Sequence, residues 1–152
     1  MKVLFICTAN VCRSPLAEGY LKNLQQKDPL ANLEIASAGV LAREGSQAFD
    51  CSIEVAQMNG FDLKEHTARQ LTLEMAQEAD MILCMETWQA ARIYDMGSDI
   101  IPKTLLLGSF HPAGHRLFQI PDPKTFTVPH TLQVFQLIQQ SVEALRLKLT
   151  DY

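Results

Sequence analysis

Two kinds of segment alternate along the chain. Short, mainly apolar runs predict strands that are buried on both faces, at residues 3–6, 33–37, 81–85 and 104–107. Between them, apolar residues recur every three or four positions and predict helices at residues 14–24, 46–58, 71–78, 88–94 and 132–149. Strands that alternate with helices predict an α/β fold of Rossmann-like type, in which helices cover both faces of a four-stranded parallel sheet and make three layers.

The loops that follow the strands are the expected place for functional residues, because ligands bind parallel sheets at the carboxyl ends of their strands. One late loop is long and irregular. Residues 108–129 contain four prolines and two glycines, and loops of this length are usually functional or disordered.

Length, charge and cysteine usage narrow the class of protein. The 152 residues suffice for one hydrophobic core, so residues 1–152 are predicted to form a single domain. A net charge of −4 and the lack of a long apolar segment argue against a nucleic-acid or membrane partner and favour a cytoplasmic location. There the four cysteines should stay reduced, and their spacing does not fit a zinc site. None of these patterns indicates the oligomeric state.

A loop suited to binding an anion follows the first predicted strand. It precedes a helix that Ser14 and Pro15 are expected to begin, as N-cap and first helical residue. Unpaired N–H groups and the helix dipole at that end favour a negative charge. The planar guanidinium of Arg13 suits two phosphate oxygens, and the same field favours the thiolate of Cys7. The predicted phosphate site comprises Cys7, Thr8, Ala9, Asn10, Val11, Cys12, Arg13 and Ser14.

A simpler interpretation of this loop is a small buried cysteine at the end of a strand and a solvated arginine on a helix. The wider sequence argues against it. The run from Cys7 to Pro15 resembles the signature Cys-x-Gly-Asn-x-Cys-Arg-Ser-Pro of the low-molecular-weight protein tyrosine phosphatases. Further segments match that family in the same order, at residues 37–39, 60–71, 85–86 and 122–123. The resemblance implies the phosphotyrosine phosphatase I type of fold.

The resemblance also implies roles for individual residues. Cys7 would attack the phosphorus of a phosphorylated protein side chain and form a cysteinyl-phosphate, while Arg13 binds the phosphoryl oxygens. Because Arg13 and backbone N–H groups supply the charge stabilisation, we expect no metal ion and no cofactor. A polar network would hold the loop, made of Asn10, Ser14, Ser37 and His66.

Cys12 has two interpretations. The resemblance implies a reversible disulfide between Cys7 and Cys12, which would protect the nucleophile and make the enzyme sensitive to oxidation. Alternatively, Cys12 is a small buried residue. Cys51, on a predicted helix, and Cys84, in a predicted strand, are expected to belong to the core.

Asp122 is the candidate general acid. Pro121 and Pro123 flank it in the late loop and stiffen the backbone that carries its carboxyl group. It would protonate the leaving group and then activate the water that hydrolyses the cysteinyl-phosphate. A second Asp-Pro pair, at residues 28–29, is interpreted as a turn at the opposite edge of the sheet.

The predicted pocket walls depart from the family. Arg43 and Lys124 stand where the family usually carries aromatic residues, and Phe126 is the nearest aromatic. We therefore expect a basic rim made of Arg43 and Lys124, without aromatic walls.

Four functions are compatible with such a loop. A protein-tyrosine phosphatase is favoured. A protein-arginine phosphatase is the alternative, and its branch of the family has Thr at the position of Val11. Arsenate reduction needs a resolving pair of cysteines after the third strand, where the sequence offers only Cys84. The joint presence of Cys7, Arg13 and Asp122 argues against a non-catalytic phosphate-binding module.

Overall fold

The computed structural model describes residues 1–30, 32–115 and 118–151. Among them, four parallel strands form a sheet in the order β2-β1-β3-β4. The strands are β1 (Lys2–Cys7), β2 (Glu34–Gly39), β3 (Met81–Cys84) and β4 (Thr104–Leu106). The predicted four-stranded parallel sheet is confirmed, and β1 and β3 are its inner strands.

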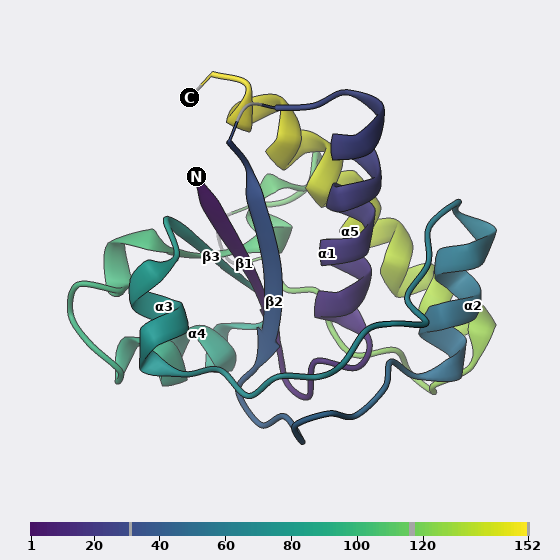
Figure 1. Ribbon diagram of the computed structural model, residues 1–152, viewed down its shortest axis with the longest axis horizontal. Coiled ribbons are helices and arrows are strands. Elements are labelled where there is room, and N and C mark those ends of the chain that lie inside the picture. The colour runs from purple at the N-terminus through teal and green to yellow at the C-terminus, as the bar shows by residue number, and fades with distance from the viewer. Residues whose placement is uncertain (31, 116–117, 152) are drawn as a thin grey trace.

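Helices cover both faces of the sheet, as predicted (Figure 1). On one face lie α1 (Arg13–Lys27), α2 (Asp50–Met58) and α5 (Val128–Leu149). On the other face lie α3 (Leu73–Glu78) and α4 (Thr87–Tyr94). Two short 3-10 helices, η1 (Ile101–Lys103) and η2 (Leu107–Phe110), flank β4.

Strand β1 shows why the sheet needs two hydrophobic cores. Its side chains alternate between the faces: Val3 and Phe5 join the core beneath α1 and α5, whereas Leu4 and Ile6 join the core beneath α3 and α4. All four are at most 1% exposed. A strand buried on both faces must be apolar throughout, which is the pattern that the sequence carries.

Several element boundaries differ from the sequence prediction, among them the starts of three helices near the candidate site. Helix α1 begins at Arg13 with Cys12 as its N-cap, so the predicted N-cap role of Ser14 is wrong. Helix α2 begins at Asp50 rather than at residue 46, because the chain before it is extended and Gln47 pairs with Thr67 in an antiparallel bridge. Helix α5 begins at Val128, four residues before the predicted start.

The late loop is shorter than predicted, because η2 extends to Phe110 and α5 starts at Val128. Residues 116–117 of this loop lie outside the described residues. Within the described part of the chain, no helix combines the length and apolar character needed to cross a membrane.

The two ends of the sheet carry different parts of the chain. The N-terminal end of β1 and the C-terminal end of α5 lie at one end of the molecule (Figure 1). The carboxyl end of β1 and the loop before α1 lie at the opposite end. The candidate residues of the sequence analysis therefore lie far from both chain termini.

Candidate active site

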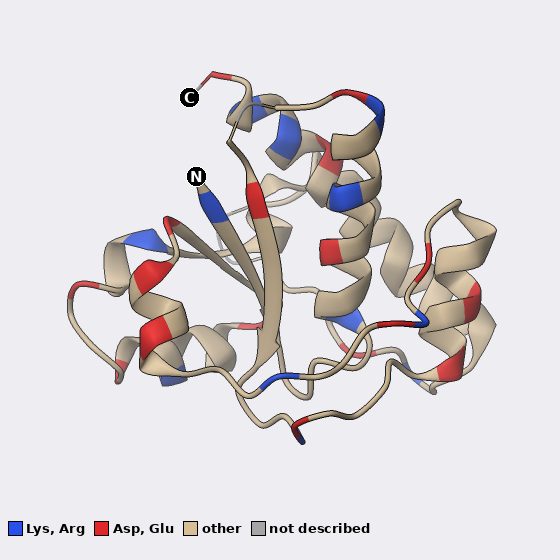
Figure 2. Cartoon of the chain, viewed as in Figure 1, with Lys and Arg blue, Asp and Glu red and all other residues tan. Residues whose placement is uncertain are grey.

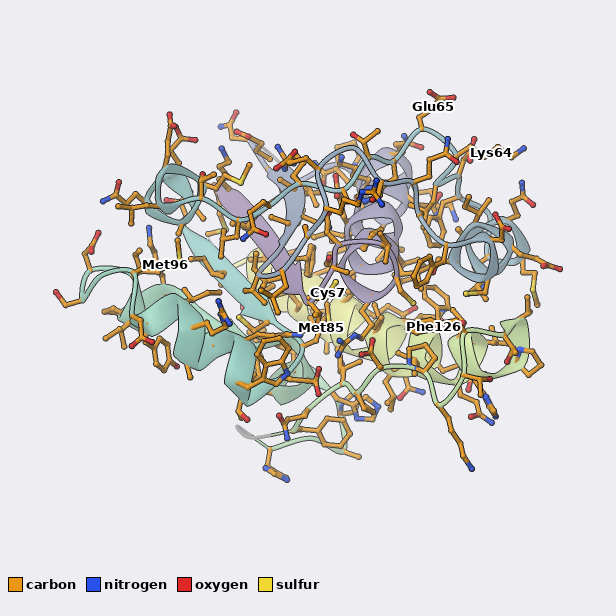
Figure 3. The ribbon with its side chains drawn as sticks, turned by 90° about the horizontal axis from the view of Figure 1, so that it is seen from below. Cys7, Lys64, Glu65, Met85, Met96 and Phe126 are labelled. Carbon is orange, nitrogen blue, oxygen red and sulfur yellow. The ribbon has the colours of Figure 1, made fainter. Side chains whose placement is uncertain are left out.

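Cys7 is the last residue of β1, at the carboxyl edge of the sheet. Figure 3 views the molecule from this end and shows Cys7 near its centre, with Phe126 to one side. The next residues leave the sheet close to its edge strand: Val40 N–H donates to the Cys7 carbonyl (3.1 Å) and Leu41 N–H to the Thr8 carbonyl (2.8 Å). The loop is thus tied to the residues that follow β2.

Gly39 explains why the chain can approach so closely at this point. A Cβ atom on Gly39 would lie 2.6 Å from the Thr8 carbonyl oxygen and 2.9 Å from the Asn10 nitrogen. Both distances are too short for any side chain, so the glycine of the Ser37-Ala38-Gly39 segment is a packing requirement of the loop.

Asn10 is the centre of the hydrogen bonds that hold the loop. It is fully buried and adopts a φ of 57°, in the left-handed region that non-glycine residues seldom occupy. Its Nδ2 donates to Ser14 Oγ (2.8 Å) and to Ser37 Oγ (2.9 Å). Its Oδ1 accepts from the backbone N–H of Arg69 (2.9 Å). These three bonds compensate for the unfavourable backbone conformation.

Two side chains from the loop after α2 complete this support. The Asn10 carbonyl lies 2.7 Å from His66 Nε2, which must donate because a carbonyl oxygen only accepts. Arg69 Nη2 donates to the Ser37 carbonyl (3.1 Å). The structure therefore brings together the four predicted support residues, Asn10, Ser14, Ser37 and His66.

The sulfur of Cys7 has two close polar neighbours. Ser14 Oγ lies 2.9 Å away, and the backbone N–H of Asn10 donates to the sulfur at 3.3 Å. Donors aimed at a sulfur favour its thiolate form. The hydroxyl of Ser14 is thus oriented toward the sulfur rather than capping α1.

Arg13 is 1% exposed despite its charge. Its Nη1 donates to Glu86 Oε2 (2.7 Å) and to the Ile120 carbonyl (2.8 Å). Its Nη2 donates to Thr8 Oγ1 (3.3 Å) and forms an ion pair with Asp122 Oδ1 (3.0 Å). The buried Nε has no hydrogen-bond partner among the described residues, which leaves one donor of the guanidinium free for an oxyanion.

Two residues near Arg13 were not assigned a role from the sequence. From the sequence, Glu86 is only part of a segment that matches the family, and Gln89 has no predicted role. Gln89 is fully buried: its Nε2 donates to Thr8 Oγ1 (3.2 Å), and its Oε1 accepts from the backbone N–H groups of Met85 and Glu86 (both 3.0 Å). It therefore links the end of β3 to the loop after β1. The only sequence signal for it is a polar residue three positions after Glu86, at the start of a helix.

A pocket of about 190 Å³ opens beside Cys7. Phe49 and Phe126 form its aromatic part, and their ring centroids are 4.9 Å apart at an angle of 73°. The expectation of a pocket without aromatic walls is therefore wrong. The full lining is Cys7, Thr8, Ala9, Val11, Cys12, Arg13, Phe49, Asp122 and Phe126.

The predicted basic rim is not part of this lining. Arg43 and Lys124 are both exposed, and neither belongs to the residues that line the pocket. The sequence does not indicate Phe49 as a pocket wall, because Phe49 falls inside a predicted helix that in fact begins one residue later. Its backbone N–H donates to the Val11 carbonyl (2.9 Å), so the pocket wall is fixed to the loop.

The remaining cysteines are buried free thiols. Burial raises the pKa of Cys12 to about 12, and it raises the pKa of Cys84 as well. Both therefore carry a proton at neutral pH. Cys84 lies in β3 and Cys51 in α2, as expected. The disulfide between Cys7 and Cys12 stays a prediction.

The second Asp-Pro pair lies away from the pocket. Asp28 caps the C-terminal end of α1, and its carboxylate pairs with Arg146 (2.7 Å). Acidic and basic residues are interspersed over the molecule (Figure 2). No group of three His, Cys, Asp or Glu side chains in residues 1–30, 32–115 and 118–151 could hold a metal ion.

Comparison with known proteins identifies the class to which this fold and site belong. The family model described as "Low molecular weight phosphotyrosine protein phosphatase" matches residues 2–151. The chain therefore belongs to this family, and it is an enzyme of the protein phosphatase class that acts on phosphorylated proteins.

Two proteins named Wzb are among the relatives that resemble this chain. It is 34% identical over 140 residues to the low molecular weight protein-tyrosine-phosphatase Wzb of Salmonella typhi, covering 92% of this chain and 88% of Wzb. Wzb from Escherichia coli K30, solved in complex with sulphate, is 32% identical with a TM-score of 0.82, covering 96% of this chain and 97% of that one.

A solved arginine phosphatase is also similar to this chain. The YwlE arginine phosphatase from Geobacillus stearothermophilus superposes with a TM-score of 0.88 at 29% identity, covering 99% of this chain and 93% of YwlE. Similarity of fold thus includes enzymes that are named for two different substrates.

Proposed function

We propose that the protein is a protein-tyrosine phosphatase in which Cys7 is the nucleophile, Arg13 binds the phosphoryl group and Asp122 is the general acid and base. One observation supports this most: all three side chains line the same pocket of about 190 Å³, at the carboxyl edge of the sheet. The N-terminal end of α1 adds a positive field for the phosphate.

The reaction would have two steps. In the first, the Cys7 thiolate forms a bond to phosphorus, the bond from phosphorus to the tyrosine oxygen breaks, and Asp122 gives its proton to that oxygen. In the second, water attacks the cysteinyl-phosphate while Asp122 removes a proton from it, and Cys7 leaves as a thiolate. Arg13 and the backbone N–H groups of the loop would stabilise the phosphoryl oxygens in both steps without a metal ion.

The pocket walls favour a phenyl ring. Phe49 and Phe126 offer aromatic faces and edges, and Val11 adds an apolar surface at the loop. A phosphotyrosine side chain is long enough to place its phosphate near Cys7 while its ring packs against these walls. Phosphoserine and phosphothreonine are shorter and would leave the walls unoccupied.

Arginine phosphatase activity is the second candidate, supported by the likeness to YwlE. A planar guanidinium would also stack against an aromatic ring, and Asp122 would offer it a carboxylate. Val11 argues against this substrate, because it has no hydroxyl with which to orient a phosphorus–nitrogen bond. Arsenate reduction has less support, since Cys84 is buried inside β3.

We also propose that the enzyme works in the cytoplasm, because a cysteine nucleophile needs a compartment that keeps thiols reduced. Fractionation of cells that express a tagged protein would test this, and recovery with exported proteins would contradict it.

The substrate is tested by comparing kcat/KM for matched phosphotyrosine and phosphoarginine peptides, in wild type and in Val11→Thr. We expect wild type to prefer phosphotyrosine and Val11→Thr to shift the ratio toward phosphoarginine. A higher value for phosphoarginine in wild type would overturn the tyrosine proposal and leave the roles of Cys7, Arg13 and Asp122 in place.

The same peptides test the basic rim. Versions with acidic and with neutral flanking residues separate charge at the rim from contacts inside the pocket. We expect acidic flanks to raise kcat/KM through Arg43 and Lys124, and added salt to weaken the preference. Equal kcat/KM values for acidic and neutral flanks would contradict the basic rim and leave the rest of the proposed function unchanged.

A further inference from the structure

Glu18 lies on α1, one turn after Ser14, and belongs to none of the roles proposed so far. Its side chain is 16% exposed. One carboxylate oxygen, Oε1, pairs with Lys22, and the other, Oε2, accepts a hydrogen bond from Ser37 Oγ. The side chain thus reaches from α1 to β2, at the side of the loop that faces away from the pocket.

The hydrogen bonds beyond Ser37 have fixed directions. The backbone N–H of Arg69 can only donate, so the oxygen of the Asn10 amide must face it and the nitrogen must face the two serines. An ionised carboxylate can only accept, so the Ser37 hydroxyl must donate to Glu18. Ser37 then accepts from Asn10 with its lone pair.

The chain of donors ends at the sulfur of Cys7. Asn10 gives its second amide hydrogen to Ser14 Oγ, so the single hydrogen of the Ser14 hydroxyl is left to be donated elsewhere. Cys7 Sγ lies 2.9 Å from this oxygen, whereas the Ala38 carbonyl lies 3.5 Å away. When Cys7 is a thiolate its sulfur can only accept, so the hydrogen then goes to the sulfur.

The backbone conformation of Asn10 also needs stabilisation by its side chain. Asn10 holds an unfavourable φ of 57°, and in that conformation its backbone N–H reaches the Cys7 sulfur at 3.3 Å. Both donors to the sulfur, the Asn10 N–H and the Ser14 hydroxyl, therefore depend on how the Asn10 side chain is held. A hydrogen bond to a charged acceptor is stronger than a neutral one and strengthens the next bond in a chain.

We propose that Glu18 is a positioning residue for the nucleophile: its carboxylate fixes the Ser37 hydroxyl, which holds Asn10 so that the Asn10 N–H and the Ser14 hydroxyl both point at Cys7. This inference rests on the proposed role of Cys7. The action of Glu18 is through hydrogen bonds rather than through its charge, because a negative charge by itself disfavours a nearby thiolate. The helix dipole contributes little, since Glu18 lies beyond the first turn of α1.

The test compares four variants by a readout that needs no phosphatase substrate. The rate constant for alkylation of Cys7 by iodoacetamide, followed by mass spectrometry across mildly acidic to neutral pH, reports how well the thiolate is stabilised. Glu18→Leu removes the acceptor, and Glu18→Gln keeps a carbonyl acceptor without the charge. Lys22→Met removes the ion pair alone. Glu65→Leu is the matched control. Glu65 and Glu18 both line a cavity of about 500 Å³ that is separate from the pocket beside Cys7, and Glu65 is exposed in the loop at the edge of Figure 3.

We expect Glu18→Leu to slow alkylation at mildly acidic pH about tenfold, the loss of one hydrogen bond near a charged group. We expect Glu18→Gln to recover most of the rate, and Lys22→Met and Glu65→Leu to match wild type. Thermal unfolding of each variant shows whether the fold is retained. If Glu18→Leu unfolds, Glu18→Ala replaces it as the variant without an acceptor, with the same expected loss of about tenfold in the alkylation rate.

Three results would overturn the inference. Equal alkylation in folded Glu18→Leu and wild type would show that Cys7 does not depend on Glu18. A rate in Glu18→Gln as low as in Glu18→Leu, or a faster rate in both, would show that the charge acts instead of the hydrogen bond. Failure of the proposed function is separate, because it appears as a Cys7 in wild type that reacts no faster than Cys51.

Discussion

The loop after β1 has two sides that differ in exposure and in the kind of contact. On its support side, Asn10, Ser14 and Ser37 are at most 1% exposed and bond to one another in fixed directions. On its substrate side, Asp122 and Phe126 are more than half exposed. One side is an interior polar network and the other is an open wall.

This difference separates the chemistry from the choice of substrate. An unpaired buried polar group is costly, so a change on the support side disturbs the loop as a whole. Exposed residues have fewer neighbours, so a change on the substrate side acts on the bound ligand alone. Relatives named for tyrosine and for arginine substrates share one fold, which agrees with selectivity that resides on the open side.

The largest effect is expected at Cys7, where the two sides meet. Cys7→Ser should lower turnover of an aryl phosphate by on the order of 10⁴-fold or more, because a hydroxyl in this site is a far weaker nucleophile than a thiolate. Circular dichroism and thermal unfolding should remain close to wild type. Activity that persists in a preparation free of other phosphatases would contradict the covalent mechanism.

Asp122→Asn is the next test and acts on the substrate side. The variant cannot protonate a leaving group, so we expect a rate of alkyl phosphate hydrolysis lower by about 10²–10⁴-fold and a smaller loss for an activated aryl phosphate. Measurement of kcat for both substrates separates the two effects. Equal losses for both substrates would exclude Asp122 as the acid.

Asn10→Ala tests the support side by removing the side chain at its centre. Alanine keeps the unfavourable φ and loses the bonds to Ser14, Ser37 and Arg69, so we expect the free energy of unfolding to fall by about 2–4 kcal/mol together with a loss of activity. Asn10→Gly is the matched variant, because glycine adopts this φ without strain. Chemical denaturation should therefore rank Asn10→Gly between wild type and Asn10→Ala; equal stability of the two variants would show that the backbone conformation carries no cost.

The smallest effect is expected at Phe126. Phe126→Ala should raise KM for a phosphotyrosine peptide by roughly threefold to tenfold, through lost contact with the ring, while kcat and the stability stay nearly unchanged. Leu147→Ala, at an exposed apolar position of α5, is the control. If kcat falls as strongly as KM rises, Phe126 belongs to the catalytic side of the comparison.

The sheet and the loop were predictable because their sequence signals are local. Strand β1 is apolar throughout, and the spacing from Cys7 to Arg13 lies within a single turn between two elements. Ala9, where the family usually has glycine, has no positive φ, so the substitution does not strain the loop. The support residues were predictable only by resemblance, since they come from three separate segments.

The pocket walls were not predictable, because they depend on contacts between residues that lie far apart in the sequence. The sequence pattern around Phe49 predicts a helix. Only the bridge between Gln47 and Thr67 shows that the chain before α2 is extended. Phe126 contacts Phe49 across a sequence separation that no local pattern encodes. The role of Glu18 was hidden too, because a charged residue on a helix usually indicates a solvated face.

The start of β1 and the C-terminal end of α5 lie at the end of the sheet opposite to Cys7 (Figure 1). A tag or a surface tether attached to either terminus is thus held on the far side of the molecule, and the pocket stays open to large phosphorylated proteins. An immobilised Cys7→Ser variant can therefore serve as a bait that presents its pocket to a cell extract, with the attachment point and the captured protein on opposite sides.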